Sequence, residues 1–130
     1  MTASAYANEY AYIEAQFDDI RLVFKLATQG CGLCAGDNYV TSYSIETRGQ
    51  SGAYYMINAE NGSARIFEGN EDKDSIVENC LGYRAVQLVR LFPQTWVGNI
   101  ALRWDVWALD DTSTYIHQRN SVHSFYELPV

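Results

Sequence analysis

Residues 53–68, AYYMINAENGSARIFE, decide how we expect this chain to fold. Two short runs rich in apolar and aromatic residues, 53–59 and 63–68, flank Glu60-Asn61-Gly62. An Asn-Gly pair supplies the left-handed backbone that a tight turn between two strands requires. The stretch therefore predicts a β-hairpin, and consecutive strands joined by short turns indicate an antiparallel sheet.

Further strands are expected on both sides of this hairpin. Residues 39–46 alternate between aromatic or apolar and polar side chains, a pattern typical of a half-exposed strand. Residues 97–110 form a longer alternating run, and after a turn at 110–113 the chain is expected to return over 115–127. Successive side chains of the long strand face opposite sides, with Ile100, Leu102, Trp104, Val106 and Ala108 in one row and Asn99, Ala101, Arg103, Asp105 and Trp107 in the other.

The N-terminal segment shows the spacing of a helix. Over residues 6–27, apolar side chains recur at steps of three and four, and most charged side chains lie between them. Thr2 or Ser4 could cap the start of such a helix, and Gly30 stands where it would stop. A strand over residues 20–26 is the alternative, because apolar residues also alternate there. We favour the helix because its pattern is longer.

A second helix is expected after Gly69. Asn70 can cap it, and the acidic residues that follow favour the positive end of a helix dipole. Apolar residues then recur on one helical face as far as Phe92, and Pro93 would stop the helix. Gly82 either sits within this helix or ends it and leaves residues 83–92 as a strand.

These elements predict an α+β fold in the order α-βββ-α-ββ. An antiparallel sheet of five to six strands would carry two helices on one face. At 130 residues the chain is long enough for one domain, which we expect to span residues 1–130.

Charge and composition restrict the possible partners and compartments. Sixteen acidic residues against nine basic ones give a formal net charge of −7, which argues against nucleic acid and against anionic membranes. The N-terminus lacks a basic segment, and no apolar run approaches the roughly 20 residues that span a membrane. An odd number of cysteines, three, is unusual in a secreted domain of this size. We therefore expect a cytoplasmic protein with reduced thiols.

Cys31 and Cys34 form a C-x-x-C motif in a glycine-rich loop over residues 30–38. Such a motif can supply half of a zinc site or form a redox disulfide. Zinc would need two further ligands, and Cys80, His117 and His123 do not form the second closely spaced pair that makes a zinc motif specific. We interpret the cysteines as packed beside the loop, and expect neither a metal nor a cofactor.

Three residues are candidates for catalysis. Arg103 and Asp105 share a face of one strand, so Asp105 could act as a general base oriented by Arg103, with His117 as a further acid or base. The fragment Arg103-Trp104-Asp105-Val106 is similar to one in limonene-epoxide hydrolases, a family in which an Arg and two Asp residues activate a water that opens an epoxide. Our second hypothesis is a small pocket enzyme, a hydrolase or isomerase of the cone-shaped α+β type. The alternative is that these charges form cross-strand pairs.

Aromatic side chains point instead to binding. The chain holds ten tyrosines and three tryptophans, more than so small a core can bury. We expect Tyr43, Tyr55 and Trp107 to contact a ligand, and a homodimer is the simplest way to cover a large apolar patch. Size, acidity and element order resemble type III secretion chaperones, which are acidic dimers that wrap a protein segment. The leading hypothesis is thus a non-catalytic binding module that forms a homodimer and binds a protein partner or a small apolar ligand.

Overall fold

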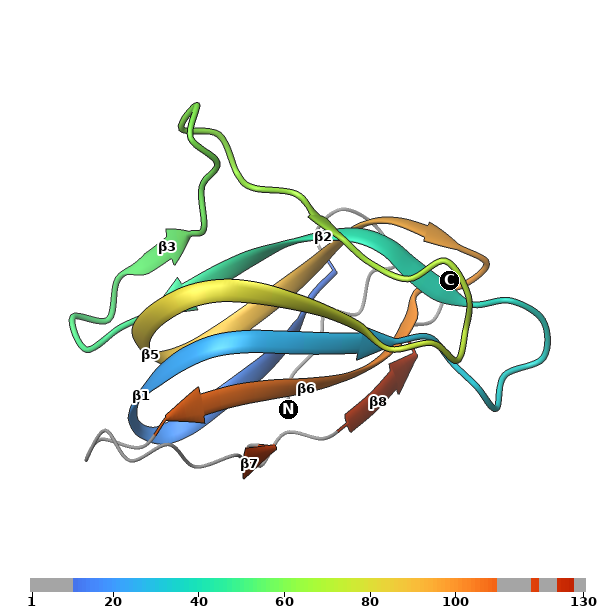
Figure 1. Ribbon diagram of the computed structural model, residues 1–130, viewed down its shortest axis with the longest axis horizontal. Helices are drawn as coiled ribbons and strands as arrows, with labels where there is room; N and C mark the ends of the chain where they lie inside the picture. The colour runs from blue at the N-terminus through green and yellow to red at the C-terminus, as the bar shows by residue number, and fades with distance from the viewer. Residues whose placement is uncertain (1–10, 110–117, 120–123, 128–130) are drawn as a thin grey trace.

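The computed structural model describes residues 11–109 and the backbone of residues 118–119 and 124–127. Within these ranges the chain forms strands and no helix (Figure 1). The strands are β1 (Ile13–Gln29), β2 (Tyr39–Arg48), β3 (Tyr54–Met56), β4 (Phe67–Glu68), β5 (Val77–Val97), β6 (Ala101–Leu109), β7 (Gln118–Arg119) and β8 (Ser124–Glu127). The predicted α+β fold with two helices is therefore wrong, and the molecule is a β-sandwich.

Two long strands build both layers of the sandwich. The strand order is β3-β2-β5-β1-β6-β7, all neighbours are antiparallel, and β4 and β8 pair with β2 and β6. The second half of β5 pairs with β2 and with the start of β1, whereas the second half of β1 pairs with β6. Each long strand bends from one layer into the other, as the curved ribbons show (Figure 1).

The first predicted helix is the long strand β1. Its N-terminal half buries every second residue, Ala11, Ile13, Ala15 and Phe17, while the intervening side chains are more exposed. Register shifts follow between Gln16 and Arg21 and between Val23 and Lys25, and at the second shift the buried positions change from the odd series that ends at Val23 to Leu26 and Thr28. Two of the four buried residues are alanines, and the alternation changes phase at the second shift. The larger apolar side chains are therefore spaced three and four residues apart, as they would be on one face of a helix. The alternative strand over residues 20–26 was the correct part of the prediction.

The second predicted helix is the strand β5. Gly82 adopts a φ of 68°, and it lies where β5 carries three residues between Cys80 and Arg84 opposite a single residue of β1. An irregularity of this kind is a β-bulge, in which glycine takes the left-handed conformation without strain. The bulge shifts the apolar pattern of β5 as the register shift does in β1. Pro93 does not end a helix but pairs with Tyr43 inside the sheet.

Outside these two segments, the strand predictions at 39–46, 97–110 and 115–127 are confirmed, whereas the hairpin strands predicted at 53–59 and 63–68 are reduced to β3 and β4, which pair with β2 and not with each other. β2 covers the run predicted at 39–46, β6 lies within 97–110, and β7 and β8 return antiparallel to it. The predicted hairpin is present as a bridge between Asn58 and Ala64, with Gly62 in the left-handed conformation at a φ of 88°. The turn predicted at 110–113 and the capping residues Thr2 and Ser4 lie outside the described residues.

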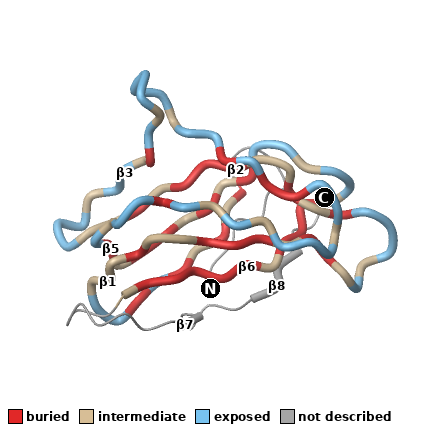
Figure 2. The backbone as a smooth tube through the Cα atoms, viewed as in Figure 1, coloured by how far each residue is buried: buried red, intermediate tan, exposed pale blue. Residues whose placement is uncertain are grey.

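The core fills the space between the layers (Figure 2). Of the two rows predicted on the long strand, the one with Trp104 faces this core, since Ile100, Leu102, Trp104, Val106 and Ala108 all belong to the buried cluster. The row of Arg103, Asp105 and Trp107 faces the other side of the layer, beside β1 and the start of β5. In the part of the chain described, no helix has the length and apolar character needed to cross a membrane.

Candidate binding surface

Two loops meet at one end of the sandwich. Residues 30–38 connect β1 to β2, and residues 69–76 lead into β5. They are neighbours because Thr28 at the end of β1 pairs with Val77 at the start of β5 (Figure 1). The contact is close, since a Cβ atom added to Gly30 would lie 2.8 Å from the Cα of Lys73. We call this end of the molecule, formed by loops 30–38 and 69–76, the loop end.

The first loop is cross-linked and hydrogen-bonded internally. A disulfide joins Cys31 to Cys34, and the Cys31 amide donates to the carbonyl of Asn38 at 3.0 Å. The buried Asn38 side chain donates to the Ala35 carbonyl at 3.1 Å, and its Oδ1 accepts the Asn99 amide at 2.7 Å. At the tip of this braced loop, Leu33 is 101% exposed.

The second loop is held by Asn70 and Asp72. The buried Asn70 carboxamide accepts from Thr28 Oγ1 at 2.8 Å and donates to the carbonyls of Thr28 and Ser75. Asp72 Oδ1 accepts the Ser75 and Asp74 amides, and Oδ2 accepts the Ser75 hydroxyl. These bonds, led by the one from the Ser75 amide, lower the pKa of the Asp72 carboxyl. Asn70, predicted to cap a helix, and Asp72, predicted to lie in its first turn, therefore hold a loop in place.

Arg103 ties both loops to β6. Its Nε donates to the Gly30 carbonyl at 2.8 Å, and its Nη2 donates to the Lys73 carbonyl at 3.1 Å. The carboxylate of Asp74 lies 3.9 Å from the same Nη2. A guanidinium offers several N–H groups in one plane, so it can bridge two chain segments that a lysine could not hold together. The sequence singled out Arg103 for catalysis, and the contacts place it in the support of the loop end.

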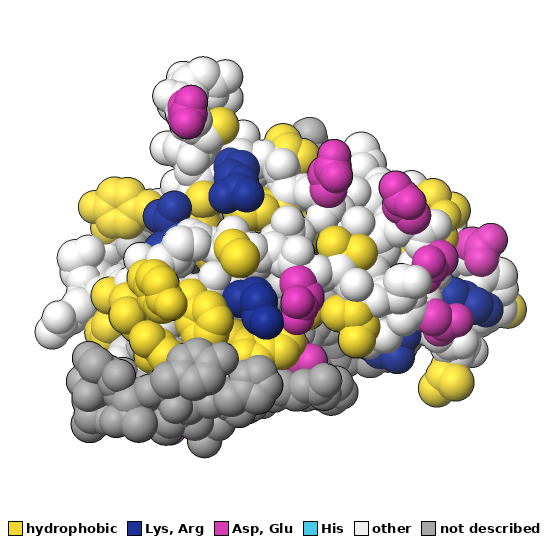
Figure 3. Space-filling view, in the orientation of Figure 1, with side chains coloured by type: hydrophobic (Ala, Val, Ile, Leu, Met, Phe, Trp, Pro, Cys, Tyr) yellow, Lys and Arg dark blue, Asp and Glu magenta, His cyan; other side chains and the backbone are white. Residues whose placement is uncertain are grey.

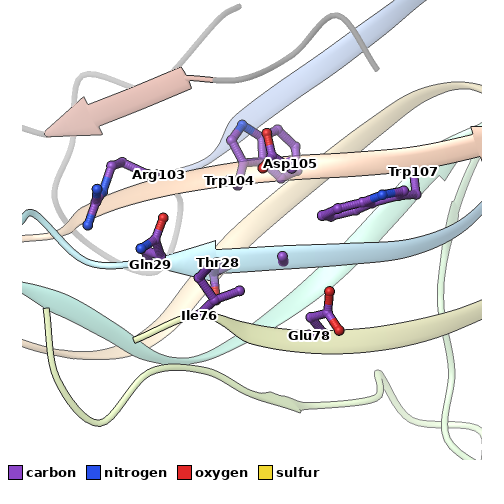
Figure 4. A pocket seen from close by; sticks show the side chains of 9 residues that line it. Thr28, Gln29, Ile76, Glu78, Arg103, Trp104, Asp105 and Trp107 are labelled. Carbon is purple, nitrogen blue, oxygen red and sulfur yellow. The ribbon is translucent and has the colours of Figure 1, made fainter. Parts of the chain in front are cut away.

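Asp105 and Trp107 line a small pocket directly beneath the loops. The pocket has a volume of about 70 Å³, and its walls come from the end of β1, the start of β5 and the row of Arg103, Asp105 and Trp107 on β6 (Figure 4). Lys25 lies 4.5 Å from the centre of the Trp107 ring and donates to Glu78 at 3.1 Å. The side chains predicted to share one face of a strand therefore share one pocket.

The remaining predicted site residues are not gathered there. Tyr43 is fully buried in the core, stacks on Phe67 and accepts a hydrogen bond from Asn79 at 2.8 Å. Burial raises the pKa of the Tyr43 hydroxyl well above its ordinary value of 10.0. Tyr55 is 64% exposed on β3, at the edge of the sheet. His117 lies outside the described residues, as does His123.

The surface of the loop end is acidic around its apolar tips. Asp37, Glu68, Glu71, Asp72 and Asp74 are all exposed there, and Lys73 is the basic residue among them. Figure 3 shows acidic side chains gathered over this side of the molecule. An open groove of about 630 Å³ runs beside the second loop, with exposed Ile66 and Glu68 on its walls. Ile76, 58% exposed, contributes a further apolar side chain.

The sequence analysis missed Leu33, the most exposed apolar residue of this surface. One signal was available: Leu33 stands between Gly32 and Cys34 in a glycine-rich loop, where no strand or helix pattern carries it into a core. An apolar residue that a loop cannot bury is a candidate for contact with a partner.

Comparisons with known proteins place this geometry in context. No protein-family model matches the chain. It is 30% identical over 105 residues to mouse retinoschisin, covering 79% of this chain and 46% of that protein. It is 32% identical over 104 residues to dog coagulation factor VIII, covering 79% of this chain and 4% of that protein. The chain thus spans less than half the length of these relatives.

A solved structure decides the fold. Recombinant discoidin II of Dictyostelium discoideum superposes with a TM-score of 0.71 at 28% identity, over 83% of this chain and 41% of that one. The chain has a discoidin-like fold. The matching regions of its relatives are discoidin domains, which are non-catalytic binding modules. The cone-shaped α+β architecture of the enzyme hypothesis and the element order shared with secretion chaperones are wrong, because the described residues form no helix.

The comparisons also correct the predicted compartment. Retinoschisin and coagulation factors V and VIII are secreted or extracellular proteins, which contradicts the cytoplasmic prediction. The disulfide between Cys31 and Cys34 contradicts the prediction of reduced thiols, and disulfides persist in oxidising compartments. The odd cysteine count misled because Cys80 is a third, free thiol beside one closed pair. Within the described ranges, no three His, Cys, Asp or Glu residues cluster as metal ligands.

Proposed function

We propose that this chain is an extracellular, non-catalytic binding module that recognises a protein partner through its loop end. The observation that carries the proposal is Leu33, fully exposed at the tip of a loop that a disulfide and the buried Asn38 hold in place. Binding residues are often found on loops that a rigid scaffold positions. A β-sandwich with two fastened loops at one end is such a scaffold.

Because hydrogen bonds hold both loops in place before binding, the loop end is suited to bind a partner tightly. Association costs free energy when loops and side chains become ordered at an interface, and a loop that is already ordered avoids much of that cost. Arg103, Asn38 and Asn70 together make hydrogen bonds to backbone groups of both loops. The loop end therefore presents Leu33 and Ile76 in a fixed arrangement before any partner arrives.

The charge around Leu33 favours a particular kind of partner. The two loops and the adjoining Glu68 contribute five exposed carboxylates, and the second loop carries one lysine, Lys73. This surface would repel anionic lipid headgroups and complement a protein surface with basic residues around an apolar patch. We therefore retain the prediction of a protein partner and of no membrane contact.

A small apolar ligand is less well supported. The pocket beneath the loops has a volume of about 70 Å³. An engineered protein cavity of about 150 Å³ holds benzene, so a pocket of half that volume suits a smaller group of atoms. Its walls also carry Glu78 and Asp105, which would lose water on contact with an apolar molecule. The engagement of Arg103 with the loops likewise supports a binding module over the pocket enzyme that we considered.

Homodimerisation remains part of the proposal. The edge strand β3 exposes Tyr54 and Tyr55, and a second copy could cover them. Sedimentation velocity on the purified chain tests this: a dimer that Tyr55→Ser dissociates would support it, and a monomer at all concentrations would contradict it.

The partner class is tested by binding of the biotin-labelled chain to intact cells of the organism that makes it. We expect binding that trypsin treatment of the cells abolishes, because the partner is a protein. In parallel, the chain is mixed with vesicles of phosphatidylcholine alone and of phosphatidylcholine with phosphatidylserine. Association with the anionic vesicles, or cell binding that survives trypsin, would contradict a protein partner and indicate a lipid or carbohydrate ligand.

A further inference from the structure

We propose that Asn61, at the tip of the hairpin formed by residues 57–65, is an N-glycosylation site. Asn61-Gly62-Ser63 satisfies the acceptor pattern N-x-S/T with a non-proline middle residue. The seven other asparagines of the 130-residue sequence do not satisfy it. Asn61 and Gly62 serve the turn of the hairpin, but the proposed binding function does not use this tripeptide.

The hairpin presents Asn61 to solvent. It projects from the sandwich beyond β3 (Figure 1), and Figure 2 shows its tip exposed. Asn61, Gly62 and Ser63 are all exposed. The hairpin closes through the Ala59 amide, which donates to the Ser63 carbonyl at 2.8 Å, and through the Gly62 amide, which donates to the Ala59 carbonyl at 3.0 Å. A bulky group at its tip would therefore displace nothing in the core.

The hydrogen bonds of the Asn61 carboxamide leave the reactive atom available. Its Oδ1 accepts both the Ser63 amide at 3.1 Å and the Ser63 hydroxyl at 2.6 Å. Its Nδ2, the atom that receives a glycan, makes no hydrogen bond to any residue that the structure describes. The Ser63 hydroxyl thus bonds to the carboxamide oxygen of Asn61, and the carboxamide nitrogen has no competing partner among the described residues.

The reaction that this site would undergo needs a lipid-linked donor. An oligosaccharyltransferase would join Asn61 Nδ2 to the anomeric carbon of an oligosaccharide carried on a polyprenyl diphosphate. The new carbon–nitrogen bond replaces the carbon–oxygen bond to the diphosphate, which leaves with the bonding electrons. Nδ2 loses one proton to a base of the transferase, and no oxidation or reduction takes place. The inference rests on the extracellular route of the proposed function, because these donors are used in the secretory pathway.

A glycan at this position is compatible with binding at the loop end. The hairpin and the two loops lie on different sides of the view in Figure 1. The hairpin continues directly from β3, the exposed edge strand of the sheet.

The test is translation of the full chain, preceded by a cleavable signal peptide, in a cell-free system with endoplasmic-reticulum microsomes. We expect one additional, slower-migrating species that peptide-N-glycosidase F removes. Digestion in H2¹⁸O should leave ¹⁸O-labelled aspartate at position 61, and a parallel incubation in H2¹⁸O without the enzyme measures the label that spontaneous deamidation of the Asn-Gly pair adds. Asn61→Gln and Ser63→Ala should abolish the slower species.

Matched variants make the result specific. Ser63→Thr keeps the acceptor pattern and should keep the modification. Asn58→Gln changes an exposed asparagine of the same hairpin outside the pattern and should have no effect. A chain that enters the microsomes, as its protection from added protease shows, but migrates as a single unmodified species would overturn the inference. That result would leave the protein-binding proposal untouched.

Discussion

Arg103 shows how a residue with apparent catalytic character can serve as a structural clamp. Its guanidinium reaches from β6 to the Gly30 and Lys73 carbonyls, so one side chain holds two loops through residues that are more than 40 positions apart in the sequence. Hydrogen bonds to a charged group contribute about 1.5–3 kcal/mol each to stability, more than bonds between neutral groups. The pattern of alternate residues correctly placed Arg103 and Asp105 on one face, but it could not reveal which loops would arrive opposite them.

We therefore expect Arg103→Ala to lower the free energy of unfolding by about 2–3 kcal/mol, because both carbonyls lose a charged donor. Urea unfolding followed by tryptophan fluorescence measures this. Arg65→Ala is the matched control, since Arg65 is exposed and lies over the Phe67 ring, a contact worth about 0.5–1 kcal/mol. Equal losses for the two variants would contradict the clamp.

Tyr43 predicts a loss of stability in alkaline solution. Burial raises the pKa of its hydroxyl in the folded state above the ordinary value of 10.0. Above pH 10 the unfolded chain releases this proton and the folded chain retains it. Stability should thus fall by about 1.4 kcal/mol per pH unit for this group until the folded-state pKa is reached. Chemical denaturation at several pH values from about 9 to about 11 measures the slope. Tyr43→Phe should remove this part of it, and an unchanged slope would contradict the assignment.

The elements most difficult to predict were the two that belong to both layers. In β1 and β5 a register shift changes which side chains face the core, so no single period of two runs through either strand. The helical spacing over 6–27 is a product of that change. Strands that stay in one layer, such as β2 and β6, keep a readable alternation and were predicted from it. The change in which side chains face the core depends on tertiary structure, because each strand bends only when the second layer packs on the first.

Gly82 is the residue that allows the bend in β5. We expect Gly82→Ala to destabilise the fold by about 1–2 kcal/mol, since an L-residue is strained at a φ of 68°. Gly49→Ala is the control, because the nearest atom to its added Cβ, the Ala85 carbonyl oxygen, would lie at an ordinary 3.5 Å. That control should be neutral or stabilise by up to about 1 kcal/mol. Thermal unfolding compares them, and equal midpoints would contradict the role of Gly82.

The disulfide should act on its loop rather than on the whole domain. It joins residues only three positions apart, and the stabilisation from a disulfide falls as the closed loop shortens. In Cys31→Ser/Cys34→Ser, we expect roughly tenfold faster hydrogen exchange for amides of residues 30–38, with little change in β2. Hydrogen-exchange mass spectrometry measures both segments. Equal exchange in the variant and the parent chain would show that Asn38 and Arg103 hold the loop without the disulfide.

At the scale of the whole molecule, the binding character was predictable and the binding surface was not. Aromatic content and acidity favoured a binding module, the class to which the relatives belong. The location required the three-dimensional arrangement, because loops 30–38 and 69–76 meet only through the pairing of β1 with β5. Tyr43, chosen as a ligand contact, proved to be a core residue, whereas Leu33 had no periodic pattern to single it out.

The most direct test of the loop end compares cell binding of the parent chain with Leu33→Ser. Burying a leucine against a partner contributes about 1.5–3 kcal/mol, so the variant should bind roughly 10-fold to 100-fold more weakly. Its folding should not change, because Leu33 is fully exposed, and Tyr83→Ser, at an exposed position of β5 outside the loop end, should bind like the parent. A Leu33→Ser chain that unfolds at the parent's midpoint and binds with the parent's affinity would contradict the proposal that this end of the sandwich is the binding surface.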